Sequence, residues 1–323
     1  MDNDERLIEF IENSFLSDLL SKPSVTDVSW NGESIFYMDN VYGRKKSNLE
    51  VKNEDVGTFL RQIANFSEKQ FSYKEPILDV SFSRYRMNAT YLSLTRVNNK
   101  KAYSFALRLA SGSSAVEHSD TFFPGNTKQV LLDAISQGKS IIIGGETGCG
   151  KTELQKFLLL HLPANTRVIV IDNVQELELS RGSGDIDMTS WLVDEKNPDA
   201  SFSALIRNAL RNNPDYLLVA ESRGPEMLDA LNAVMSGHPL ITTLHALDAP
   251  SIPHRIARLA MQAGRNLVYE ELLADIYHHL SVIVYLKRSK DKKGRIFRRI
   301  SELGFLNEAT RAIDFYYQED KEQ

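Results

Sequence analysis

The spacing of apolar residues in the first third of the chain predicts a small domain of helices and antiparallel strands. Apolar residues recur every three or four positions over residues 5–20, which predicts a helix that ends at Lys22-Pro23. Two short β-like runs flank Asn31-Gly32, a pair that tolerates the positive φ of a tight turn, so a β-hairpin is expected there. A second helix is expected over residues 54–67.

Two longer strand-like runs follow, over residues 77–94 and 102–110, and Asn98-Asn99 supplies the turn between them. We therefore expect residues 1–112 to form an α+β domain built on an antiparallel sheet. Residues 113–127 are mostly small and polar and are punctuated by glycine and proline, which is typical of a linker.

After this linker the pattern changes to short apolar runs that alternate with helical spacing. Such alternation predicts a mainly parallel sheet with helices on its faces, so residues 128–323 are expected to form an α/β domain. Strands are expected at residues 141–143, 168–171, 216–220, 240–243 and 281–285.

The clearest chemical motif, GETGCGKT, follows the first of these strands and opens a helix. Its glycines let backbone N–H groups turn toward phosphates, and the helix N-terminus adds a positive dipole end. Lys151 is expected to reach the β- and γ-phosphates, and the Thr152 hydroxyl to bind Mg²⁺. Cys149 is expected to have no chemical role, although a bulky oxidation adduct there would block the site. The predicted loop comprises Gly145, Glu146, Thr147, Gly148, Cys149, Gly150, Lys151 and Thr152.

Acidic residues and a histidine follow other strands of the same predicted sheet. Asp172 and Glu176 lie just beyond the second strand, at the carboxyl end where ligands collect in α/β sheets. Glu221 ends the strand 216–220, which is a Walker B arrangement with glutamate as its terminal carboxylate. His245 ends the strand of LITTLHA and is a candidate to face the nucleotide. On the helix before the Walker B strand, Arg207 and Arg211 share one face.

Composition limits the classes of function. The 323 residues are 42% hydrophobic and 25% charged, with a net charge of −5, which disfavours nucleic acid as a direct ligand. The single cysteine excludes an intrachain disulfide, and no zinc-binding spacing occurs. An acidic start and no apolar run long enough to span a bilayer indicate a cytoplasmic protein, joined to a membrane only through partners.

Together these motifs resemble the traffic ATPases of bacterial type IV secretion, type II secretion and type IV pili. The resemblance rests on GETGCGKT, IDNVQELEL, LIRNALRNNPDYLLVAESRG and SGHPLITTLHA, in family order over nearly the whole chain. Three departures bear on it. The aspartate box has Asp172-Asn173 in place of the usual Glu-Asp, tetracysteine zinc modules are absent, and Gly224 stands where pilus-retraction members carry Asp. The last feature and the short N-terminal domain favour the type IV secretion or conjugation (VirB-type) branch.

The resemblance implies a RecA-like ATPase domain preceded by a PAS-like domain, with ATP and Mg²⁺ as cofactors. It implies that Glu176, in the aspartate box, or Glu221 is the general base, and that Asp172 is the first acid of that box. His238 and His245 match the histidine box, which senses the γ-phosphate. It further suggests as nucleotide contacts the arginines Arg84, Arg86, Arg108, Arg207 and Arg211.

The resemblance also implies a homohexamer, with nucleotide between the two domains, acting on membrane-embedded secretion or pilus proteins at the inner face of the cell membrane. Three alternatives stay open: a type IV pilus or type II secretion motor, a scaffold that binds ATP and hydrolyses it negligibly, and a nucleic-acid translocase. The transported substrate and the direction of force are not encoded in these motifs.

Overall fold

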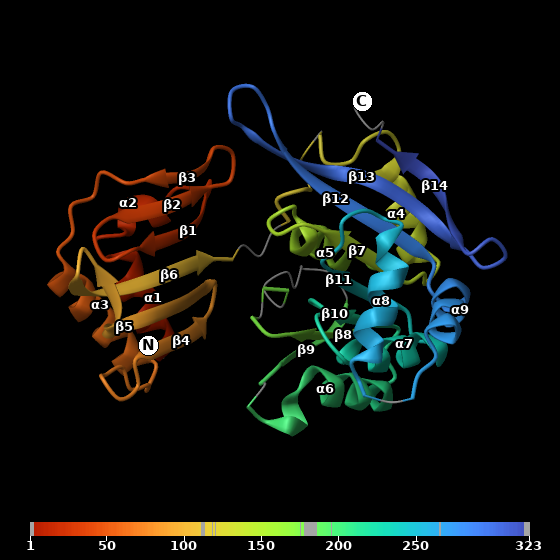
Figure 1. The fold of residues 1–323 in the computed structure, drawn as a ribbon, viewed down its shortest axis with the longest axis horizontal. Helices are drawn as coiled ribbons and strands as arrows, with labels where there is room; N and C mark the ends of the chain where they lie inside the picture. Colours follow the sequence, from red (N-terminus) through yellow and green to blue (C-terminus); the bar gives the residue numbers. More distant parts are fainter. Residues whose placement is uncertain are drawn as a thin grey trace. The chain divides into compact units, whose positions relative to one another are not determined.

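The computed structural model describes residues 3–110, 114–117, 119, 121–174, 176–177, 186–194, 196–264 and 266–319. Residues 113, 118 and 120 of the predicted linker and residues 175 and 178–179 of the acidic stretch lie outside this description. The chain divides into two compact units, 1–111 with 290–296, and 112–289 with 297–323 (Figure 1).

The first unit is a six-stranded sheet with helices on one face. Its strand order is β3-β2-β1-β6-β5-β4, and the pairings are antiparallel. The strands are β1 (Val25–Trp30), β2 (Ile35–Asp39), β3 (Gly43–Lys46), β4 (Ile77–Phe82), β5 (Tyr85–Val97) and β6 (Lys100–Leu109). The helices are α1 (Asn3–Glu12), α2 (Ser17–Leu20) and α3 (Asn53–Phe66).

The apolar positions of α1, α3 and alternate strand residues form one core in this unit. Ile11 of α1 and Leu60 of α3 are fully buried together with strand residues such as Met87 and Leu107. Because successive strand residues point to opposite faces, the neighbouring Arg86 and Arg108 lie on the face away from this core. The predicted antiparallel sheet is therefore confirmed.

The turns of this unit show where local sequence decides structure. Asn98 and Asn99 both have positive φ, 49° and 61°, as the predicted turn requires. The hairpin at Asn31-Gly32 is also confirmed, but with a four-residue connection in which the Asn31 side chain accepts hydrogen bonds from the N–H groups of the next turn residues, Glu33 and Ser34.

The single helix predicted over residues 5–20 is wrong, because α1 and α2 are separate. The Ser14 hydroxyl donates to the Ile11 carbonyl at 2.7 Å and accepts from the Leu16 N–H at 3.2 Å. A serine side chain that bonds the local backbone competes with the helical ladder, which accounts for the break.

The second unit has an eight-stranded sheet in the order β14-β13-β12-β7-β11-β10-β8-β9. The run from β12 to β9 is parallel, and β13 and β14 form an antiparallel extension. The strands are β7 (Ile141–Gly145), β8 (Arg167–Asp172), β9 (Asp187–Leu192), β10 (Tyr216–Val219), β11 (Leu240–Leu244), β12 (Val282–Lys290), β13 (Ile296–Asn307) and β14 (Ala312–Gln318).

Helices cover both faces of this sheet. Ile141 and Ile143 of β7 pack with α4 (Thr127–Ser136) and α5 (Lys151–Leu160), whereas Ile142 faces the opposite core. That second core contains α6 (Phe202–Ala209), α7 (Glu226–Met235), α8 (Ser251–Met261) and α9 (Tyr269–His279). Short 3₁₀ turns lie at η2 (Pro198–Ala200) and η3 (Leu210–Asn212). Burial on both faces explains why these strands are continuously apolar, and the mainly parallel sheet is confirmed.

Candidate nucleotide site at the carboxyl end of β7

The phosphate loop connects the central strand β7 to α5. Gly148 and Gly150 have φ values of 74° and 103°, in the left-handed region that favours glycine. A Cβ on Gly145 would lie 2.5 Å from the Cys149 sulfur and 2.7 Å from the Leu286 carbonyl oxygen. The glycines therefore fit the tight path of this loop.

Lys151 is turned into the loop from the first residue of α5. Its Nζ donates to the carbonyl oxygens of Gly145 and Glu146, both at 3.0 Å, and lies 3.5 Å from Nδ1 of His245. Burial lowers the pKa of Lys151 below its ordinary value, and the nearby Glu221 carboxylate partly offsets this effect. The ammonium thus sits in a partly desolvated site where an added anion would interact strongly with it.

Glu221 reaches the same place from the end of β10. Its Oε1 lies 3.0 Å from Nε2 of His245, and its Oε2 accepts from the Arg223 guanidinium at 2.7 Å. Oε1 is buried and, despite that short distance, has no aligned hydrogen bond among the described residues. The sheet order brings these side chains together, because β11 lies between β7 and β10 and all three strands are parallel.

Cys149 is fully buried beneath the loop. Burial raises the pKa of its thiol, which disfavours the reactive thiolate. This placement supports the expectation that Cys149 packs and does no chemistry.

The aspartate box is organised by Asp172, which is buried at the end of β8. Its Oδ1 accepts from the Val174 N–H at 3.0 Å and its Oδ2 from the Leu177 N–H at 3.2 Å. Burial raises the pKa of Asp172, while these backbone hydrogen bonds act in the opposite direction. Glu176 is half-buried on the turn that Asp172 holds. Asp172 therefore supports the loop that carries Glu176, and its two oxygens point to backbone.

Some predicted residues lie at the amino ends of the central strands, whereas the phosphate loop lies at their carboxyl ends. His238 follows the Schellman turn that ends α7, where Gly237 has φ 90° and the His238 N–H bonds the Ala233 carbonyl. It therefore precedes β11, whereas His245 follows it, and a five-residue strand separates them by roughly 17 Å.

The arginines before β10 are placed similarly. Arg211 lies in η3, just before the amino end of β10, and Arg207 on α6 pairs with Asp229 of α7 at 3.1 Å. The structure thus does not bring Arg207, Arg211 or His238 to Lys151 within one chain, and their predicted roles stay predictions.

The three arginines predicted in the first unit each have a carboxylate partner there. Arg84 pairs with Glu12 at 2.7 Å, Arg86 with Asp79 at 3.8 Å and Arg108 with Asp27 at 3.3 Å. Arg86 and Arg108 are directly opposite on β5 and β6. Their predicted contact with nucleotide stays a prediction.

Two residues at the phosphate loop were missed by the sequence analysis. Arg298 of β13 donates from Nε to the Gly148 carbonyl at 2.8 Å, and Arg288 of β12 approaches the same glycine. Both follow the last predicted strand, in a charged and polar stretch without a recognisable motif. Their position beside the phosphate loop becomes clear only from the pairing of β12 with β7.

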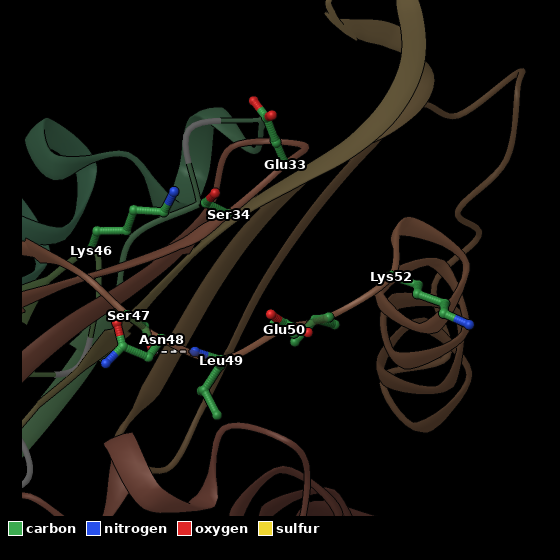
Figure 2. A pocket seen from close by; sticks show the side chains of 9 residues that line it. Glu33, Ser34, Lys46, Ser47, Asn48, Leu49, Glu50 and Lys52 are labelled. Carbon is green, nitrogen blue, oxygen red and sulfur yellow. Dashed lines mark hydrogen bonds between the residues drawn. The ribbon is translucent and has the colours of Figure 1, made fainter.

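A hollow of about 580 Å³ lies in the first unit along the segment before α3 (Figure 2). Lys46, Ser47 and Glu50 are among its lining residues, and none of the predicted site residues lines it. Within this segment the Leu49 N–H donates to the Ser47 side-chain hydroxyl at 3.2 Å, a local hydrogen bond between residues two apart (Figure 2).

The residues at the loop fit a magnesium nucleotide. Mg²⁺ in such sites takes one or two protein oxygens together with phosphate oxygens and waters. Thr152 lies in the first turn of α5, and the buried Oε1 of Glu221 is a carboxylate oxygen without an aligned hydrogen-bond donor. Among the described residues, no group of three His, Cys, Asp or Glu side chains forms a metal site by itself.

Comparisons with known proteins agree with this arrangement. Residues 94–311 match the family model described as "Type II/IV secretion system protein". An uncharacterised protein of Bacillus anthracis is 26% identical over 318 residues, covering 93% of this chain and 70% of that protein. The type IV secretion system protein VirB11 of Brucella suis is 32% identical over 201 residues, covering 60% of this chain and 55% of that protein.

Solved structures show the same fold. The Legionella pneumophila ATPase DotB aligns with a TM-score of 0.70 at 21% identity, over 95% of this chain and 81% of that one. The pilus retraction motor PilT, solved with bound ADP, aligns with a TM-score of 0.65 at 21% identity, over 96% and 85%. Within the described residues, no helix has the length and apolar character needed to cross a bilayer. The chain belongs to the type II/IV secretion family, and over 201 residues its sequence is similar to the VirB11 proteins of type IV secretion.

Proposed function

We propose that this chain hydrolyses ATP with Mg²⁺ as a homohexameric ring and powers type IV secretion or conjugation-type transport. The observation that carries the proposal is the meeting of three side chains: Lys151 at the start of α5, after the loop that follows β7, His245 after β11, and Glu221 after β10. A lysine beside a phosphate loop can stabilise the negative charge of a transferring phosphoryl group, a buried carboxylate there can hold Mg²⁺ or orient water, and the histidine lies between the two.

Nucleotide binding would use groups that the loop already presents. Lys151 would exchange the carbonyls of Gly145 and Glu146 for the β- and γ-phosphates, while the amides of the loop bind phosphate oxygens. Thr152 and Glu221 would hold Mg²⁺, whose charge neutralises the phosphates when it is bound.

In the reaction, a water oxygen attacks the γ-phosphorus while the bond from that phosphorus to the β,γ-bridging oxygen breaks. A carboxylate orients the water and takes its proton, and Lys151 stabilises the negative charge on the leaving ADP. Glu221 is the carboxylate beside Lys151 and His245, and Glu176 is held on its own loop by Asp172. His245 links Lys151 to Glu221, so it is suited to sense the γ-phosphate.

The proposal places the protein in the cytoplasm, working on membrane-embedded secretion proteins through direct contacts. The second unit is proposed to be the RecA-like motor domain and the first a PAS-like domain, divided by a linker at 113–127. Since the chain spans 55% of the Brucella VirB11 length, the transport activity is proposed from the site and the family together.

ATP turnover measured against protein concentration, with molar mass by light scattering on the same samples, tests this proposal. Specific activity is expected to rise as a hexamer forms, and Arg84→Ala, Arg86→Ala and Arg108→Ala are each expected to lower it. Full turnover by a persistent monomer would contradict the ring. A ring that binds ATP without turnover would instead support the scaffold alternative.

A further inference from the structure

Two arginines flank the phosphate loop on the side away from Glu221. Arg298 donates from Nε to the Gly148 carbonyl at 2.8 Å, and its Cδ lies 3.7 Å from where a Cβ on Gly150 would stand. Arg288 Nη1 lies 3.7 Å from where a Cβ on Gly148 would stand. The two side chains therefore converge on the middle of the loop.

The sheet order fixes the side from which they approach. Strand β7 has β12 on one side and β11 on the other, and Leu286 of β12 pairs with Gly145 at the start of the loop. Glu221 and His245 belong to the β11 side, where the Lys151 ammonium lies. Since this lysine reaches the β- and γ-phosphates in phosphate loops, the arginine side corresponds to the phosphates nearer the nucleoside.

The charges at this place favour an anion. Burial lowers the pKa of Arg298, and the neighbouring Arg288 cation lowers it further, while Cys149 and Glu153 act in the opposite direction. Glu153 is itself engaged by the Lys156 ammonium at 3.0 Å and the Ala115 N–H at 2.6 Å. In the described part of the chain, Arg288 has no carboxylate within ion-pair distance. Like charges held together in a desolvated place are relieved by a bound anion.

We propose that Arg288 and Arg298 bind the α- and β-phosphates of the nucleotide held by the phosphate loop of the same chain. The inference rests on the proposed function, in which that loop binds ATP. It adds that both arginines bind ADP and ATP alike, because both nucleotides carry the phosphates nearer the nucleoside. Contacts that are equal in the ground state and the transition state raise affinity and lower KM without raising kcat.

Binding of a fluorescent ADP and a non-hydrolysable ATP analogue to Arg288→Gln and Arg298→Gln tests the proposal. Each variant is expected to lose about tenfold or more in affinity for both nucleotides, by similar factors, since charge-assisted phosphate contacts are among the strong hydrogen bonds. KM for ATP is expected to rise by the same factor, while kcat stays at the wild-type value.

Lys287→Gln is the matched control, because it removes one positive charge from the adjacent position of β12, whose side chain is on the other face of the strand. Its affinity for ADP is expected to stay at the wild-type value. Arg298→Lys keeps the charge but loses the planar fork, and is expected to recover part of the affinity.

The outcomes separate this inference from its premise. Wild-type protein that fails to bind ADP would contradict the proposed function itself. Wild-type binding with unchanged ADP affinity in Arg288→Gln would overturn the inference alone, and so would a loss confined to the ATP analogue. Arg288 has no hydrogen bond to the loop backbone among those described, so its variant decides the matter even where Arg298→Gln disturbs folding. The ADP affinity of Arg288→Gln is also expected to fall less steeply with added salt than that of wild type.

Discussion

Replacement of Asp172 by asparagine isolates the role of a buried carboxylate in placing Glu176. Asp172 is 1% exposed, and its oxygens accept backbone N–H groups: Oδ1 accepts from Val174 and Oδ2 from Leu177. Asparagine keeps one acceptor oxygen but presents an NH₂ group to the other N–H, so two donors face each other. The turn that carries Glu176 then loses one of the hydrogen bonds by which Asp172 holds it.

The size of the effect follows from the hydrogen bonds. A hydrogen bond to a charged group contributes about 1.5–3 kcal/mol, and a buried N–H left without an acceptor costs about 1–3 kcal/mol. We therefore expect Asp172→Asn to lower the free energy of unfolding by about 2–3 kcal/mol. Asp172→Ala, which removes both acceptors, is expected to lower it by about 2–6 kcal/mol, twice the cost of one unpaired N–H.

Urea unfolding, ADP affinity and ATP turnover are measured on the same preparations. The account predicts that turnover of Asp172→Asn falls by about tenfold or more, because a displaced carboxylate loses general-base catalysis, while ADP affinity stays near wild type. Asp187→Asn makes the same change on an exposed carboxylate at the edge strand β9 and is expected to alter little. Unchanged stability of Asp172→Asn would refute the reasoning, and so would a loss of ADP affinity larger than the loss of turnover.

Three further predictions concern the loop and the first unit. Gly145→Ala would place a methyl group 2.5 Å from the Cys149 sulfur. We expect this overpacking to lower the free energy of unfolding in urea by about 1–3 kcal/mol and to weaken ADP binding. Wild-type stability and affinity would show that the loop is less tightly packed than described. Because burial raises the pKa of Cys149, its alkylation by iodoacetamide, followed by mass spectrometry, should be about 100-fold or more slower in native than in urea-unfolded protein, and similar rates would contradict this. The Tyr85 hydroxyl, with the Arg84 cation, lowers the pKa of Glu12 below 4.5, so Glu12→Gln should be less stable than wild type above that pH. This difference should vanish as pH falls through the lowered pKa of folded Glu12, and a difference that persists in acid would exclude the carboxylate as its source.

The central strands of the second unit could be predicted because both of their faces are buried. Ile141 to Ile143 and Val168 to Ile171 are continuously apolar for that reason. The edge strands β9 and β14 and the outer strand β13 were not predicted, since their mixed sequences carry little periodic signal. DMTSWL and AIDFYYQ are partly exposed along most of their length.

The chemistry of the site could be predicted only where residues are close in sequence or follow buried strands. GETGCGKT is local, and Glu221 and His245 end strands whose carboxyl ends meet at one edge. Arg298 is 150 positions from Gly148, the residue that it contacts, so no local pattern joins them. The sequence shows an acidic residue, Asp172, after a buried strand. Its hydrogen bonds to the Val174 and Leu177 N–H groups depend on the folded turn and could not be predicted.

The central claim is that the Lys151 loop and Glu221 form an ATP-hydrolysing site. Phosphate release from ATP, measured with and without Mg²⁺ for wild type, Lys151→Ala and Glu221→Gln, tests it most directly. The account predicts Mg²⁺-dependent turnover in wild type, loss of nucleotide binding in Lys151→Ala, and retained ADP binding in Glu221→Gln. Turnover of Glu221→Gln is expected to fall about 100-fold or more, because the carboxylate beside Lys151 and His245 is lost from the place where charge develops. Turnover in Lys151→Ala at the wild-type rate, or in Glu221→Gln without reduction, would contradict it.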